Sequence, residues 1–369
     1  MTSKPSAFKH WINAEVVEAI AAEIHAVYPN FNRKEFAKVA EELAALELKA
    51  RVLAVAAALA QHLPKAYPEA LRILEEVMAR DRLQGFALWP FSEFIGQRGL
   101  GHVPQSLRAM LLLTQKFTAE FAVRPFFLSD PAPVLAAFRE FATHESHHVR
   151  RWVSEGSRPL LPWGAKLPGF IERPELTLEL LDLLRYDDEL YVRKSVANHL
   201  NDVSKHHPKL VVQTLAAWQK ACPPEHALKI AWITRQALRT LIKKGDPAAL
   251  RLLGVRADAQ VKVRGFALRK KLLRIGENLE FSFVLRSTAK KPQRLVVDYV
   301  LHFRRAKGSL GKKVFKLKTL ELAAGETLEI RKSHSLKPIT TMRYYPGEQR
   351  VSLQINGKSG RAKIFKLRD

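Results

Sequence analysis

The sequence predicts a mainly α-helical repeat protein that ends in a small all-β domain. Three observations support this: helical spacing of apolar residues up to about residue 255, a helical motif that recurs about every 40 residues, and a change to a period of two residues after residue 256. The 369 residues are enough for two or three domains. We expect a HEAT-like helical solenoid over residues 1–256 and an immunoglobulin-like β-sandwich over residues 257–369.

The first two thirds of the chain are rich in Ala, Leu and charged residues, and apolar residues recur there every three or four positions. This spacing places an apolar stripe along one side of a helix. The pattern is clearest over residues 14–27 and 34–62. We expect the glycine-containing stretch from Trp89 to His102 to be a long connection between helices.

One helical motif occurs in three copies. His148-Val-Arg-Arg-Trp-Val-Ser-Glu-Gly156 is followed 43 residues later by Tyr191-Val-Arg-Lys-Ser-Val-Ala-Asn-His199, and a weaker copy, Trp232-Ile-Thr-Arg-Gln-Ala-Leu-Arg-Thr240, follows after 41 more. A helical period of about 40–47 residues is typical of HEAT and armadillo arrays. In such arrays each helix pair buries its apolar face against its neighbours.

The three copies share a polar face. It carries five basic residues and two carboxylates, namely Arg151, Lys194, Arg235, Arg239, Lys243, Glu155 and Asp202. Solenoids often bind their partners on such a face. The alternatives are a merely solvated face and, for Asp202, a simple ion pair with Lys205 or Lys194. Two carboxylates inside a basic stripe are harder to explain as a solvated face.

The last third of the chain changes to period two. Apolar residues alternate with polar ones over 279–285 and 295–303, and shorter runs follow at 314–317, 328–330, 351–355 and 364–367. Turn signals separate them at Ala324-Gly325, Pro346-Gly347 and Asn356-Gly357. Short alternating runs with spaced turns predict an antiparallel sandwich.

The chain is strongly basic, with a formal net charge of +25. Residues 260–369 hold 27 of the 61 Lys and Arg but only 8 of the 36 Asp and Glu. Such a field favours a polyanion such as DNA, RNA or an anionic membrane surface. The alternative is a basic surface that only serves solubility.

Several other functions find no support in the sequence. Cys222 is the only cysteine, which excludes an intramolecular disulfide or a cysteine-rich metal site and suits a reducing compartment. The N-terminus lacks the apolar core of a signal peptide, and the apolar run 52–60 is too short to span a membrane. His147-His148 and His206-His207 point in different directions on a helix, and no carboxylate pattern completes a metal site. We therefore expect a cytoplasmic protein without membrane contact and without a metal.

Two further residues are notable for their surroundings. Glu120 lies in the apolar stretch 117–123, where a carboxylate needs a partner or its pKa rises. It could simply cap a helix or pair with Arg124. Trp163 ends the proline-rich segment Arg158-Pro-Leu-Leu-Pro-Trp163, where a tryptophan is either an aromatic platform or ordinary core.

The segments 148–156, 158–163 and 191–202 resemble those of the bacterial AlkC/AlkD alkylpurine DNA glycosylases. The appended β-domain resembles the immunoglobulin-like module of the AlkC branch, and the resemblance covers essentially the whole chain. It implies a monofunctional base-excision-repair glycosylase that removes cationic bases from duplex DNA without base flipping. The bases implied are 3-methyladenine, 3-methylcytosine and 1-methyladenine. No cofactor is implied, and we expect a monomer that is associated with the nucleoid when bound to DNA.

The resemblance also implies residue roles. Asp202 and Glu120 correspond to the acidic catalytic pair, Glu155 is their companion, and Trp163 is the aromatic residue beside the deoxyribose. The residues expected to contact DNA are Arg150, Arg151, Arg158, Arg193, Lys194, Lys205, Arg235, Arg239, Lys243, Arg304 and Arg305. They would neutralise phosphates, which makes binding depend on salt.

Two alternative functions remain open on the sequence. A non-catalytic HEAT-repeat scaffold that binds DNA structures would carry the same basic stripe and tail. It does not require Glu120, Trp163 and Asp202 to converge. An RNA-binding module is the second alternative, although the chain has no RRM or KH signature.

Overall fold

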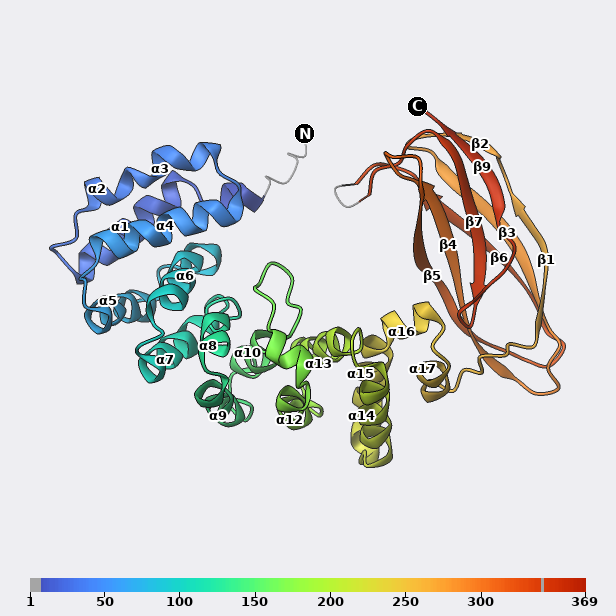
Figure 1. Cartoon of the computed structure of the whole chain (residues 1–369), viewed down its shortest axis with the longest axis horizontal. Coiled ribbons are helices and arrows are strands. Elements are labelled where there is room, and N and C mark those ends of the chain that lie inside the picture. Colours follow the sequence, from blue (N-terminus) through green and yellow to red (C-terminus); the bar gives the residue numbers. More distant parts are fainter. Residues whose placement is uncertain (1–7, 340–341) are drawn as a thin grey trace. The chain divides into compact units, whose positions relative to one another are not determined.

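The computed structural model describes residues 8–339 and 342–369. Helices form the chain up to Leu252 and strands form it from Val261 onward (Figure 1). The fold class is therefore the predicted one. Contacts divide the chain into a first unit, Met1–His206 with Cys222–Ala237, and a second unit, His207–Ala221 with Leu238–Asp369. The domain boundary at residue 256 stays a prediction.

The helices of the first unit follow one another in chain order (Figure 1). Their bounds are α1 (Ala14–Val27), α2 (Arg33–Ala37), α3 (Val39–Glu42), α4 (Leu48–His62), α5 (Tyr67–Ala79), α6 (Trp89–Arg98), α7 (Val103–Thr114), α8 (Arg124–Ser129), α9 (Pro131–Phe141), α10 (His147–Gly156), α11 (Pro168–Glu172), α12 (Glu175–Leu184), α13 (Leu190–Val203) and α15 (Ala227–Ala237). Short 3₁₀ turns occur at Phe8–Trp11, Leu43–Ala45, Gly85–Leu88 and Pro224–His226.

Helix α6 corrects one expectation, because most of the stretch expected to be a connection is helical. Pro90 lies in the first turn, where a missing N–H breaks no helical hydrogen bond. Gly96 brings the helix close to the backbone of Ala122, where a Cβ would lie 3.1 Å from the carbonyl oxygen. Buried aromatic residues of α6, such as Phe91, supply the packing that offsets the low helix propensity of glycine.

The repeat is visible as a recurring contact. Arg150, in the first turn of α10, donates to the two carbonyls five and six residues before it at 2.7 and 2.8 Å. Arg193, 43 residues later in α13, makes the same pair of bonds at 2.7 and 2.6 Å. Helices α10, α13 and α15 pack in sequence. The two motif copies therefore form the same local structure.

The second unit contains three helices and a two-sheet sandwich. Its elements are α14 (Pro208–Lys220), α16 (Arg239–Lys244), α17 (Pro247–Leu252), β1 (Val261–Leu268), β2 (Leu272–Arg274), β3 (Asn278–Ser287), β4 (Gln293–Arg304), β5 (Leu310–Leu322), β6 (Thr327–Ser335), β7 (Gly347–Ile355), β8 (Lys358–Ser359) and β9 (Lys363–Arg368). One sheet has the order β1-β3-β6, and the other has the order β2-β9-β7-β4-β5, with β8 paired to β7.

The six alternating runs predicted from the sequence all lie in strands of the sandwich. Their inward residues, such as Phe283 of β3 and Leu301 of β4, form its core. The sequence reasoning missed β1, β2 and the two-residue strand β8. Strand β1 includes Lys262, Arg264 and Gly265 and pairs on one side only, with β3. Val261 and Val263 alternate with Lys262 and Arg264, but this run is mostly exposed and ends after four residues at Gly265.

Two glycines hold helix α16 close to the sandwich within the second unit. Gly245 and Gly357 both have left-handed backbone, with φ of 76° and 81°. A Cβ on Gly357 would lie 2.0 Å from the Cα of Gly245, so neither position has room for a side chain. Gln354 donates to the carbonyl of Lys243 at 2.9 Å beside this contact.

We expect Gly357→Ala to lower the free energy of unfolding by roughly 2 kcal/mol or more, because it adds a steric clash to the cost of a left-handed residue. Thermal unfolding and faster hydrogen exchange in α16 would show this. Gly325→Ala is the matched control, since Gly325 has φ of 71° and no atom near its Cβ position. Equal losses in both variants would show that the glycine contact contributes nothing.

Candidate active site

Charged side chains of the first unit converge in one group, which we call the carboxylate cluster. Its members are Glu120, Arg151, Glu155, Arg158, Asp202 and Lys205. Glu120 lies between α7 and α8, while Arg151 and Glu155 lie one turn apart on α10. Arg158 follows α10, and Asp202 lies in the last turn of α13. The repeat brings these residues together because it packs α10 against α13.

Carboxylates and guanidinium groups alternate in the cluster. Arg151 forms an ion pair with Oε2 of Glu120, and its Nη2 lies 3.5 Å from Oε1 of Glu155. Arg158 donates from Nη1 to the same Oε1 at 2.6 Å. Its Nε and Nη2 both contact Oδ2 of Asp202 at 2.8 Å. Each of these two arginines therefore joins two carboxylates.

The three carboxylate residues of the cluster are buried and paired with cationic side chains. Its three carboxylate residues are 9, 7 and 2 % exposed in chain order. Burial alone would raise the pKa of Glu155, but the charges of Arg151 and Arg158 outweigh it and hold the pKa below its ordinary value. Lys205 ends the series with a 2.8 Å contact to Oδ1 of Asp202. The three carboxylates are therefore held in place by the cationic side chains around them.

The carboxylate oxygens differ in their partners. Both oxygens of Asp202 are bound, and Ser195 donates to Oε2 of Glu155 at 2.6 Å, so both oxygens of Glu155 are bound too. Thr118 donates to Oε2 of Glu120 at 3.0 Å, the oxygen that also takes the ion pair. Among the described residues, Oε1 of Glu120 has no partner. That atom can accept a hydrogen bond from water.

Trp163 lies on a loop that is anchored beside the cluster. The loop follows α10 and is drawn in bright green in Figure 1. Arg124, only 1 % exposed, donates to the carbonyl of Ala165 at 2.5 Å and to that of Gly156 at 3.1 Å. Trp163 itself is 74 % exposed, with φ of 64°. The indole is therefore not core, and it is presented to solvent by a loop that Arg124 holds.

Arg124 is not the ion-pair partner of Glu120, which was one of the alternatives for that carboxylate. Its bonds go to backbone carbonyls of the loop, and Glu120 pairs with Arg151. Burial and the neighbouring charge of Arg158 lower the pKa of Arg124 to about 10, so it still carries its charge at neutral pH. It adds a positive charge near the three carboxylates of the cluster.

The predicted DNA-contacting residues fall into three groups. Arg151, Arg158 and Lys205 belong to the cluster. Arg150 binds the carboxylate of Asp187 at 2.6 and 3.1 Å in addition to its two carbonyls, so it and Arg193 serve the local fold. The rest lie outside the cluster: Lys194 on α13, Arg235 on α15, Arg239 and Lys243 on α16, and Arg304 and Arg305 at the end of β4. Their contact with DNA stays a prediction.

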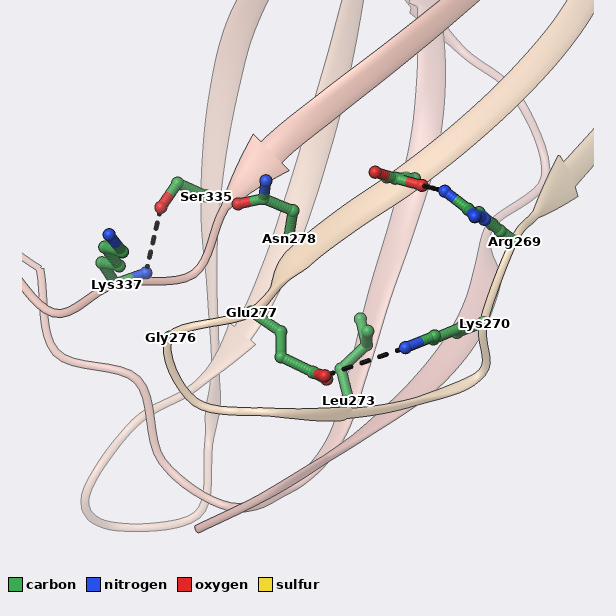
Figure 2. Close-up of a pocket in the computed structure, with 9 residues that line it drawn as sticks. Arg269, Lys270, Leu273, Gly276, Glu277, Asn278, Ser335 and Lys337 are labelled. Carbon is green, nitrogen blue, oxygen red and sulfur yellow. Dashed lines mark hydrogen bonds and ion pairs between the residues drawn. The ribbon is translucent and has the colours of Figure 1, made fainter.

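Hollows lined by described residues occur along the β-sandwich of the second unit. Figure 2 shows one of about 410 Å³, in which Arg269 pairs with Glu280 at 2.6 Å and Lys270 lies 3.8 Å from Glu277. These four charges offset one another, and Lys337 leaves the lining with a net charge of +1. Two larger hollows, of about 590 and 810 Å³, lie along β1.

Sequence reasoning missed Thr118, Arg124, Tyr191 and Ser195. Tyr191 lies under the guanidinium of Arg151, 5.1 Å from ring centre to Cζ. Ser195 lies inside the repeat motif, but the equivalent position of the first copy is a tryptophan. Comparing the two copies therefore predicts a buried apolar position and gives no indication that the hydroxyl group binds a carboxylate.

The described part of the chain contains no helix that is both long enough and apolar enough to cross a membrane. Within residues 8–339 and 342–369 there is also no group of three or more His, Cys, Asp or Glu side chains arranged to hold a metal ion.

Comparisons with known proteins agree with this architecture. Residues 262–369 match the family model described as "Uncharacterised protein YhaZ, C-terminal Ig-like domain". The protein YhaZ of Bacillus subtilis strain 168, itself described as uncharacterised, is 37% identical over 352 residues, which are 95% of this chain and 96% of YhaZ. The structure of Pseudomonas fluorescens alkylpurine DNA glycosylase AlkC, bound to DNA containing an abasic site analog, superposes with a TM-score of 0.92. It is 38% identical and is matched over 98% of this chain and 100% of that one.

Identity of this extent over the full length, together with the same succession of helices and β-sandwich, shows a shared family. The chain belongs, with YhaZ, to the AlkC-type alkylpurine DNA glycosylase family of helical-repeat proteins that carry a C-terminal immunoglobulin-like domain.

Proposed function

We propose that the chain is a monofunctional DNA glycosylase of base excision repair, which hydrolyses the N-glycosidic bond of cationic N-alkylated bases in duplex DNA. The observation that carries the proposal is the convergence of three buried carboxylates next to a loop that exposes a tryptophan. A scaffold that only binds DNA has no need for such a cluster. The likeness to AlkC supports the same reading.

The chemistry requires negative charge at the sugar. Alkylation of a ring nitrogen makes the base cationic, so it departs as a neutral molecule with the electron pair of the glycosidic bond. The deoxyribose then becomes oxocarbenium-like, and fixed carboxylates stabilise that positive charge without reorganising. A water oxygen bonds to C1′, and a base takes up its proton. Glycoside hydrolases use paired carboxylates in a similar way.

The oxygen partners suggest a division of roles. We assign Glu120 to the attacking water, because its Oε1 is unoccupied among the described residues. Glu155 and Asp202 have both oxygens bound, so we assign them the electrostatic role. Trp163 would stabilise the sugar cation through its ring face, a contribution of about 0.5–2 kcal/mol.

The substrates proposed are 3-methyladenine, 3-methylcytosine and 1-methyladenine, removed without base flipping. A flipped base needs an enclosing pocket. The strongly exposed Trp163 supports an open site instead. The exposed basic residues Lys194, Arg235, Lys243, Arg304 and Arg305 would contact the phosphates, which makes binding weaken steeply with salt. We propose that the protein acts as a monomer on nucleoid DNA in the cytoplasm.

The test is release of base from duplex oligonucleotides that contain one 3-methylcytosine or one 3-methyladenine. Wild type should release the base, and Trp163→Ala should be slower by roughly 3- to 30-fold, the range of a cation–π contact. Trp163→Phe, which keeps an aromatic face, should retain part of the rate. No release from either lesion, with salt-sensitive DNA binding intact, would favour the scaffold.

A further inference from the structure

A chain of buried hydroxyl groups lies behind Glu155. Ser195 on α13 has its Oγ 2.6 Å from Oε2 of Glu155 and 2.9 Å from Oγ of Ser154. Both serines are almost completely buried, at 2 % exposure or less. Water therefore does not replace either partner, and the hydroxyl groups bind Glu155 and each other.

The number of hydrogen atoms decides which hydroxyl group is the donor in each of these hydrogen bonds. The hydroxyl of Ser195 has one hydrogen and two close oxygen partners. An ionised carboxylate only accepts, so the hydrogen of Ser195 goes to Glu155. Ser154 must then donate its own hydrogen to Ser195. The hydrogen bonds therefore run from Ser154 to Ser195 and from Ser195 to Glu155. The last acceptor carries a negative charge, which strengthens each bond.

His199 forms a hydrogen bond with the backbone carbonyl group of Ser154. Its Nδ1 lies 3.0 Å from the carbonyl oxygen of Ser154, which only accepts, so Nδ1 carries the hydrogen. Its Nε2 lies 3.1 Å from Oγ1 of Thr177. Complete burial lowers the pKa of His199 to about 4, so the ring is neutral at pH 7. Thr177 donates to the carbonyl oxygen of Pro174 at 3.1 Å, which ties its hydroxyl group to the start of α12. The position of Ser154 is thus fixed from α12 and α13 together.

We propose that Ser195 is a positioning residue for Glu155: it fixes the carboxylate in one orientation and occupies its second oxygen, so that Glu155 acts through its charge while Glu120 keeps an oxygen for water. Arg158 and Arg151 face only Oε1 of Glu155. Ser195 provides the only bond to Oε2 among the described residues. The proposal rests on the glycosylase function proposed above.

Loss of this bond has a directional consequence for pH. The Ser195 hydrogen bond is one of the interactions that lower the pKa of Glu155, together with Arg151 and Arg158. Removing it raises that pKa. Activity that needs ionised Glu155 then falls off at a higher pH on the acid side. The other ionisable groups that interact with Glu155 are Arg124, Tyr191 and His199.

The experiment compares wild type, Ser195→Ala and Ser195→Thr in single-turnover base release between pH 5 and 8, with affinity for abasic-site duplex measured alongside. We expect Ser195→Ala to slow release by roughly ten- to a hundredfold, as for a lost hydrogen bond to a charged group. Its acid limb should move to higher pH and its DNA affinity should stay within about twofold. Ser195→Thr keeps the hydroxyl and should recover much of the rate.

Ser106→Ala is the matched control, because Ser106 is equally buried and its hydroxyl binds the carbonyl of Gly99 and Tyr67 instead. It should change stability but not the pH profile. An unchanged pH profile and rate in Ser195→Ala, or a loss of rate that only follows DNA affinity, overturns the proposal.

A second measurement separates this proposal from the proposed function. The side-chain carboxyl of Glu155 can be titrated by ¹³C NMR, with Glu155→Gln providing the assignment. A raised pKa in Ser195→Ala supports the positioning role even if wild type releases no base, in which case only the glycosylase function fails. An unchanged titration overturns the positioning role whatever the activity.

Discussion

Glu120→Gln is expected to reduce base release by roughly 10²- to 10³-fold while leaving DNA affinity nearly unchanged. The amide keeps the shape of the side chain and can still contact Arg151 through its oxygen. It cannot take the proton of the attacking water, and it replaces one of the three carboxylates that we propose stabilise the sugar cation. The effect should therefore appear in the rate of the chemical step and not in binding.

Single-turnover release from a 3-methylcytosine duplex, with DNA affinity measured in parallel, tests this. Glu172→Gln is the matched control, since Glu172 is an exposed residue at the end of α11, outside the cluster. A Glu120→Gln variant that retains most of the wild-type rate would remove Glu120 from the mechanism and leave the water-binding role to another group.

Arg158→Met is expected to have the largest effect on stability, a loss of about 3–5 kcal/mol in the free energy of unfolding. Removing one partner of a buried ion pair leaves the other charge without compensation. Arg158 is the link between two carboxylates, Glu155 and Asp202, which are 7 and 2 % exposed. Methionine fills much of the volume but supplies no hydrogen-bond donor.

Urea unfolding at pH 7, monitored by circular dichroism and by tryptophan fluorescence, measures this loss. Arg139→Met should cost less than about 1 kcal/mol, because the Arg139–Glu179 pair is exposed. Adding Asp202→Asn to Arg158→Met should restore part of the stability, since one of the two carboxylates that lost their partner Arg158 is then replaced by a neutral amide. No recovery in the double variant would mean that lost packing, and not charge, causes the effect.

The loss of stability caused by Arg158→Met is expected to depend on pH. The pKa of Glu155 is lowered in the folded protein, so its stabilising contribution is present above its unfolded pKa and is lost as pH falls through the folded value. Arg158→Met removes one cause of that lowering. The stability difference between wild type and variant should therefore narrow when the pH drops below about 4. A difference that stays constant down to pH 3 would contradict the electrostatic explanation.

The sequence was informative where structure follows local periodicity. The 43-residue recurrence of the motif around Arg150 and Arg193 reappears as the same pair of bonds from the arginine to the carbonyls five and six residues before it. The alternation in 279–285 and 295–303 reappears as β3 and β4. The stretch Trp89–His102 misled the sequence reasoning because one proline and three glycines in 14 residues are typical of a loop. Buried packing of α6 overrides that local preference.

Periodicity and composition are properties of neighbouring residues, so they were enough to predict a helical part followed by a β-part, the repeat and the excess of positive charge. The sequence also singled out Glu120, Glu155, Asp202 and Trp163. Only the tertiary structure decided their partners. Arg158 meets Asp202 across 44 positions, and Ser195 meets Glu155 across 40. Such bonds depend on how α10 packs against α13, and no pattern within either helix encodes which oxygen is bound and which is left for water.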